Sequence, residues 1–114
     1  MMFQNNSPDF LTLTLTIFGE ARGEPIEGQI AVGCVIRNRV DDEKESYKEV
    51  CLKPKQFSCW NSSDPNYPIL MQLSQRLNQD EFINDAALVQ CEWVAAGIIG
   101  SFITDNVNGA KNYV

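Results

Sequence analysis

The stretch at residues 18–29, FGEARGEPIEGQ, constrains the fold more than any other part of this chain. Apolar residues recur at helical spacing before and after it, but Gly23 and Pro25 interrupt the pattern. Glycine ends helices readily, and a residue that precedes a proline avoids the α region. The sequence therefore predicts two helices with a bend between them. Because the stretch also holds three glutamates and an arginine, we expect a functional site there.

The helix before the bend has an ambiguous pattern. Ser7, Pro8 and an aspartate supply a helix start near residue 8. Over residues 11–17, however, leucines and an isoleucine alternate with threonines, as they would in a strand. The Pro-Asp start and the Glu-Ala-Arg continuation favour the helix. A second helix should then run from Pro25 to about Val40.

The rest of the chain predicts further helices around one irregular stretch. Helical spacing returns at residues 68–79 and 80–100, and it places Trp93 in the core. Residues 41–49 are charged and should be solvated, while residues 50–68 show little periodicity and predict a long loop or short hairpin. The predicted fold class is therefore mainly α, with an α+β character if the hairpin forms.

Length and charge limit the class of protein. A chain of 114 residues suits a single domain. Its net charge of -6 repels phosphate backbones and anionic membranes, so nucleic acid is not an expected partner. We expect no membrane span, since no apolar run reaches about 18 residues. No basic residue precedes the N-terminal apolar run, so we also expect no signal peptide and synthesis in the cytoplasm.

The absence of histidine restricts the chemistry. It removes the usual base of serine and cysteine hydrolases and the usual ligand of catalytic zinc. The four cysteines match no CxxC spacing, so we expect neither a metal nor a cofactor, and buried reduced thiols are favoured over two disulfides. Proton transfer must then fall to carboxylates. Glu20 suits a general acid, because the end of an apolar helix disfavours its ionised form.

Two motifs and a closing element give the chain a family resemblance. Residues 18–29 and the helix that follows resemble the signature of the SleB-type cell-wall hydrolases, which include spore-cortex-lytic enzymes and phage endolysins. The matching residues after the bend are Ala31, Val32, Asn38, Arg39 and Val40, then Gln56, Phe57, Ser58 and Cys59 as the family's QFSC element, and Gly109, Ala110 and Tyr113 as its closing GA-x-x-Y element.

The resemblance implies a lysozyme-like helical domain at residues 10–114, after a flexible segment at residues 1–9. It implies cleavage of the peptidoglycan glycan strand between N-acetylmuramic acid and N-acetylglucosamine, with Glu20 as the single acid and base of a lytic transglycosylase. A hydrolytic muramidase and a non-catalytic peptidoglycan-binding or virion domain are the alternatives. We expect a monomer that acts on the cell wall or in the periplasm, and a phage lysin of this kind would be released with help from a holin.

Several other residues are candidates for substrate binding. Aromatic rings can stack on sugars, and amides can bond their N-acetyl groups. Glu24 would lie about 5 to 6 Å from Glu20 on a continuous helix, near the spacing of a retaining carboxylate pair, but Pro25 disfavours that geometry. Glu24 is therefore either a structural partner of Arg22 or Arg39 or part of the site. The substrate-binding candidates are Glu24, Gln56, Phe57, Ser58, Trp60, Asn61 and Tyr113, with Tyr67 as a further aromatic.

Overall fold

The computed structural model describes residues 7–112, and their secondary structure is entirely helical. No strand occurs within this range, so residues 50–68 do not form the hairpin that was the alternative to a loop, and the α+β label is not confirmed. The radius of gyration of 12.9 Å is that of one compact domain, for which about 13 Å is typical at this size. The elements are α1 (Pro8–Ala21), α2 (Ile26–Glu43), α3 (Tyr47–Leu52), the short 3₁₀ helix η1 (Ser58–Trp60), α4 (Tyr67–Asn78) and α5 (Ala86–Ile99).

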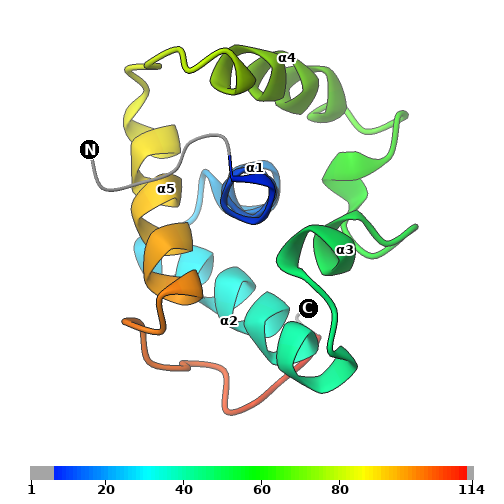
Figure 1. Cartoon of the computed structure of the whole chain (residues 1–114), viewed down its shortest axis with the longest axis vertical. Helices are drawn as coiled ribbons and strands as arrows, with labels where there is room; N and C mark the ends of the chain where they lie inside the picture. The colour runs from blue at the N-terminus through cyan, green and yellow to red at the C-terminus, as the bar shows by residue number, and fades with distance from the viewer. Residues whose placement is uncertain (1–6, 113–114) are drawn as a thin grey trace.

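Helix α1 is the centre of the molecule. Figure 1 shows it end-on, with α5, α2, α3 and α4 arranged around it, and it packs against all four and against η1. Every residue from Phe10 to Phe18 is buried as a result. This explains the strand-like alternation, because a helix that is covered on all sides needs no polar face. The hydroxyl of Thr16 donates to the carbonyl of Thr12 at 2.7 Å, whereas that of Thr14 is buried without a partner among the described residues.

The predicted bend is confirmed. Helix α1 ends at Ala21, and α2 begins at Ile26 directly after Pro25, which has an extended conformation. Pro8 and Asp9 form the first turn of α1, within the range expected to be a flexible terminal segment. Helix α2 continues three residues beyond the expected end and stops at Lys44, which adopts a left-handed conformation. The bend leaves the last turn of α1 at the edge of the bundle, next to η1.

Helix α3 was not predicted, because it lies across a charged stretch and the start of the expected loop. Ser46 caps it: its hydroxyl accepts from the backbone N–H of Glu49, whose carboxylate accepts from the N–H of Ser46. This reciprocal pair is a capping box. The helix buries Val50 and Cys51 against α1 and α2. The chain after it crosses to η1, which is thereby held against the end of α1.

The last helix departs from prediction in its start and its orientation. Helix α5 begins at Ala86, where the carboxylate of Asp85 accepts from the N–H of Leu88, so Phe82 lies before it and is 78% exposed. Trp93 is 63% exposed, and its expected place in the core is wrong. The helix is apolar on nearly every face, so periodicity alone cannot identify the buried one. No described helix is both long and apolar enough to span a membrane.

Candidate active site

A polar cavity of about 440 Å³ lies beside the last turn of α1. It brings together four residues that the sequence nominated from two distant segments, namely Glu20, Gln56, Ser58 and Asn61. Glu20 is the one acidic side chain among the described residues that line this cavity. The others are Arg39, Lys55 and Asn112. A half-buried carboxylate among amides, a hydroxyl and two cations is suited to proton transfer on a polar, neutral substrate.

Glu20 is held in place by η1. The backbone N–H of Cys59 donates to Glu20 Oε2 at 3.1 Å. This bond fixes the orientation of the carboxylate.

The close approach of η1 depends on Gly19. A Cβ atom at this position would lie 2.7 Å from Cβ and 2.9 Å from Sγ of Cys59. Real Cβ contacts of that length are essentially never seen, so only glycine lets η1 come this near to α1. Gly19 and Glu20 therefore act together. Gly19 makes room for η1, and the Cys59 N–H of η1 holds the carboxylate of Glu20.

The Cys59 thiol is part of the same arrangement. Cys59 is 1% exposed, and its burial, together with a hydrogen bond to Glu20, raises the pKa of the thiol above its usual range. A thiol that stays protonated is a hydrogen-bond donor, so it supports the carboxylate rather than competing with it. All four cysteines are unpaired and buried, as the sequence favoured.

Arg39 ties the remaining wall of the cavity together. It is only 8% exposed, and it donates to Gln56 Oε1 at 2.8 Å, to Asn112 Oδ1 at 3.1 Å and to the carbonyl of Lys111. Its guanidinium also lies 5.2 Å from the centre of the Phe57 ring. The sequence indicated Arg39 only as part of a motif and as a possible partner of Glu24. Its role in joining α2, the QFSC element and the closing segment was missed.

Residues 23–114 match the model of the cell wall hydrolase family. The chain belongs to this family. Two spore cortex-lytic enzymes are similar over shorter stretches. That of Bacillus subtilis is 51% identical over 58 residues, which is 49% of this chain and 18% of that protein, and that of Oceanobacillus iheyensis is 38% identical over 52 residues, 44% of this chain and 19% of that protein. These matches support the SleB-type resemblance. The matched segments thus span about a fifth of those relatives, and no solved structure matches the chain.

The family match begins at Gly23, three residues after Glu20. It therefore covers the bend, α2, the QFSC element and the closing segment of this cell wall hydrolase, but it does not reach the carboxylate itself. The assignment of Glu20 to the site depends on the sequence motif and on the cavity that the described residues form. Tyr113, the last residue of the expected closing element, lies outside the described residues.

Two aromatic candidates do not reach the cavity. Phe57 is 2% exposed and packs in the core under Arg39, so the expectation that its ring stacks on a sugar is wrong. Trp60 is half-buried, and its Nε1 donates to Thr16 Oγ1 at 2.9 Å, which directs it along α1 into a second cavity that Tyr67 also lines. The cavity beside Glu20 is consequently lined by polar rather than aromatic side chains.

Glu24 is not brought to the cavity either. It is exposed in the bend, outside the described lining of the Glu20 site. Arg22, one of its expected partners, instead donates to Asn66 Oδ1 at 2.8 Å and lies 4.8 Å from the centre of the Phe18 ring. The described residues thus do not assemble a pair of carboxylates from Glu20 and Glu24.

Proposed function

We propose that this chain cleaves the glycan strand of peptidoglycan between N-acetylmuramic acid and N-acetylglucosamine, with Glu20 as the single acid and base. The observation that carries the proposal is the position of Glu20, the one carboxylate among the described residues that line a polar cavity, held by a backbone N–H. Membership of the cell wall hydrolase family supports the substrate class. A mechanism with one carboxylate is favoured, because Glu24 lies outside the cavity.

The chemistry can be completed without a nucleophile from the protein. Protonated Glu20 donates its proton to the glycosidic oxygen as the bond from that oxygen to C1 of muramic acid breaks. The resulting carboxylate, stabilised by the Cys59 N–H, then takes the proton of the muramic acid 6-hydroxyl. Oxygen 6 forms the new bond to C1 and closes a 1,6-anhydro ring. No water is consumed, and Glu20 regains its proton for the next cycle.

The rest of the cavity would bind the sugars by hydrogen bonds. Gln56 and Asn61 offer amide groups and Ser58 a hydroxyl, which can pair with N-acetyl and hydroxyl groups. Arg39 donates to Oε1 of Gln56 and so fixes that oxygen, which leaves the amide nitrogen as the donor for substrate. These residues would position the strand across Glu20.

Digestion of purified sacculi tests the proposal. The unmodified chain should release muropeptides that end in anhydro-muramic acid, and Glu20→Gln should be about 10²- to 10⁴-fold slower, the usual contribution of a positioned acid and base. Glutamine retains an oxygen for the Cys59 N–H, so the variant should stay folded. Glu24→Gln, at an exposed glutamate outside the cavity, is the matched control and should be active.

The masses of the products separate the outcomes. Anhydro ends support the transglycosylase mechanism, and reducing ends, heavier by one water molecule, would instead indicate a hydrolytic muramidase. If Glu20→Gln and the unmodified chain digest sacculi equally well, Glu20 is not the acid. Binding to sacculi without any released product would point to the non-catalytic alternative.

A further inference from the structure

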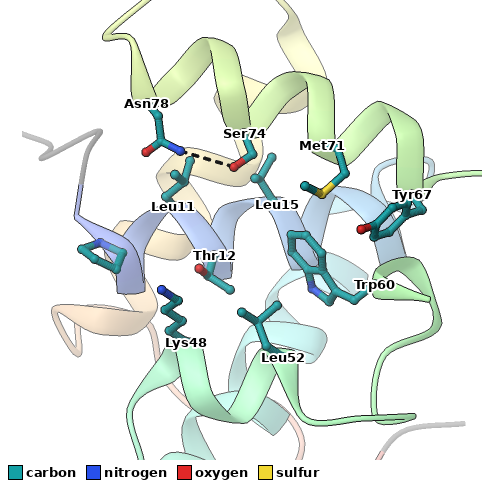
Figure 2. Close-up of a pocket in the computed structure, with 11 residues that line it drawn as sticks. Leu11, Thr12, Leu15, Lys48, Leu52, Trp60, Tyr67, Met71, Ser74 and Asn78 are labelled. Atoms are coloured by element: carbon teal, nitrogen blue, oxygen red, sulfur yellow. Dashed lines mark hydrogen bonds between the residues drawn. The ribbon is translucent and has the colours of Figure 1, made fainter. Parts of the chain in front are cut away.

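A second cavity, also of about 440 Å³, runs along α1 between α3 and α4. Figure 2 shows Leu11 and Leu15 of α1 along this groove, with Leu52 of α3 on one side and Met71 of α4 on the other. Leu52 and Met71 are 41% and 45% exposed, a large apolar area for two side chains at the surface of a small domain. The groove is therefore an apolar slot that packing within the chain does not fill.

The groove and the Glu20 cavity are both lined by residues of η1. Trp60, at the end of η1, lines the groove, while Ser58 and Asn61 on either side of it line the Glu20 cavity. Trp60 is fixed by its hydrogen bond to Thr16, so it forms a stable boundary between the two sites. A ligand that crosses Trp60 can occupy both.

The two ends of the groove differ in chemistry. Trp60 and Tyr67 lie together at the end near η1, whereas Lys48 of α3 lies toward the opposite end (Figure 2). The backbone N–H of Lys48 donates to Asp9, but its side chain forms no ion pair with another described residue. An unpaired ammonium beside an apolar slot, in a chain of net charge -6, is suited to a carboxylate at the end of an apolar ligand.

The length of the groove sets the size of the ligand. It follows α1 from Pro8 to Leu15, which is about 10 Å at 1.5 Å per residue. Three residues of extended peptide span about the same distance. The leucine and methionine side chains suit apolar groups of such a peptide, and Thr12, Ser74 and Asn78 offer hydrogen-bond partners for its backbone.

We propose that this groove binds the stem peptide of peptidoglycan, the short peptide that branches from muramic acid. The inference rests on the proposed function, which places muramic acid at Glu20, on the other side of Trp60. Such a peptide has alanine methyl groups for the apolar slot and free carboxylates for Lys48. The groove then selects strands that still bear peptides over strands from which the peptides have been removed.

Binding measured on the Glu20→Gln chain tests this without turnover. Calorimetric titration compares the disaccharide GlcNAc-MurNAc with the same disaccharide bearing a tetrapeptide. The peptide-bearing ligand should bind about tenfold more tightly, equivalent to about 1.4 kcal/mol. Lys48→Glu should remove that advantage. Lys44→Glu, an exposed lysine at the end of α2, makes the same change in charge outside the groove and should preserve it.

Met71→Glu offers a second probe at an exposed apolar position, with its melting temperature as the check on folding. It too should weaken the peptide-bearing ligand alone. Equal affinity of the two ligands would overturn the proposal, as would equal losses in the Lys48 and Lys44 variants or a loss that affects the bare disaccharide as strongly. If sacculi are not cleaved but the tetrapeptide advantage depends on Lys48, the proposed function fails while the groove assignment holds.

Discussion

Gly19→Ala tests whether the approach of η1 to α1 is what holds the carboxylate of Glu20. The added methyl group would lie 2.7 Å from Cβ of Cys59 and 3.0 Å from Cδ1 of Leu70. The first contact is with an atom close to the backbone, so it cannot be relieved by rotating a side chain. Either η1 or the end of α1 must shift, and the 3.1 Å bond from the Cys59 N–H to Glu20 is stretched.

The effects on stability and on activity should differ in size. Overpacking of this kind costs about 1–3 kcal/mol, whereas alanine in place of a helical glycine returns about 1 kcal/mol. The net loss in the free energy of unfolding is then at most about 2 kcal/mol. A hydrogen bond to a charged group contributes about 1.5–3 kcal/mol, and its loss at the carboxylate corresponds to roughly 10- to 100-fold in rate.

Gly23→Ala is the matched control, because a Cβ atom there would meet nothing within 4 Å. Urea unfolding gives the stabilities, and turnover of sacculi by folded protein gives the rates. Gly19→Ala should lose far more activity than its stability explains, while Gly23→Ala should behave like the unmodified chain. Normal turnover in Gly19→Ala would refute the reasoning, since the carboxylate would then not depend on η1.

Three further predictions concern the framework of the site. Arg39→Lys keeps the charge but loses the planar contact over Phe57 and most of its hydrogen bonds. Urea unfolding should therefore show a free energy of unfolding lower by about 2–3 kcal/mol. Unchanged stability would contradict the role given to Arg39. Ser46→Ala removes the cap of α3 and should cost about 1 kcal/mol, which scanning calorimetry would register as a melting temperature lower by about 4 °C. Burial raises the pKa values of Cys51 and Cys91 to about 12, whereas thiols in the unfolded chain ionise near pH 8.5. The contribution of these two folded thiols to stability is therefore complete below about pH 8.5. It is lost as the pH rises toward 12, by about 1.4 kcal/mol per pH unit for each thiol. Unfolding under reducing conditions should show this decline and a smaller slope in Cys91→Ala, and a flat profile would contradict it.

The parts of the fold that the sequence predicted are those in which local signals agree. The bend at residues 22–25 follows from glycine and proline, whose backbone preferences act whatever surrounds them. Helix α1 was predicted from its start signal despite its strand-like alternation. The alternation is misleading because a helix that is buried on all sides needs no particular spacing of apolar residues.

The parts that were missed depend on contacts that no local pattern encodes. Helix α3 has a local signal, the Ser46–Glu49 capping box, but its charged surroundings obscured it. The sequence shows that residues 57 and 93 are aromatic, but it does not show which way their rings face. The Phe57 ring is buried beneath Arg39, and the Trp93 ring is exposed. Whether an aromatic ring faces the core or the surface is decided by neighbours distant in sequence.

Distant contacts also explain why the family's motifs occur together in one chain. Glu20 is bonded to a residue 39 positions away, and Arg39 reaches Gln56 and, 73 positions away, Asn112. Asn38 adds a bond from its amide to the carbonyl of Ala110 at 3.0 Å. The Gly-Glu pair, the Asn-Arg pair, the QFSC element and the closing segment are therefore one contiguous structure around the cavity. A change in the closing segment should alter the site through Arg39 and Gln56, without direct contact with Glu20.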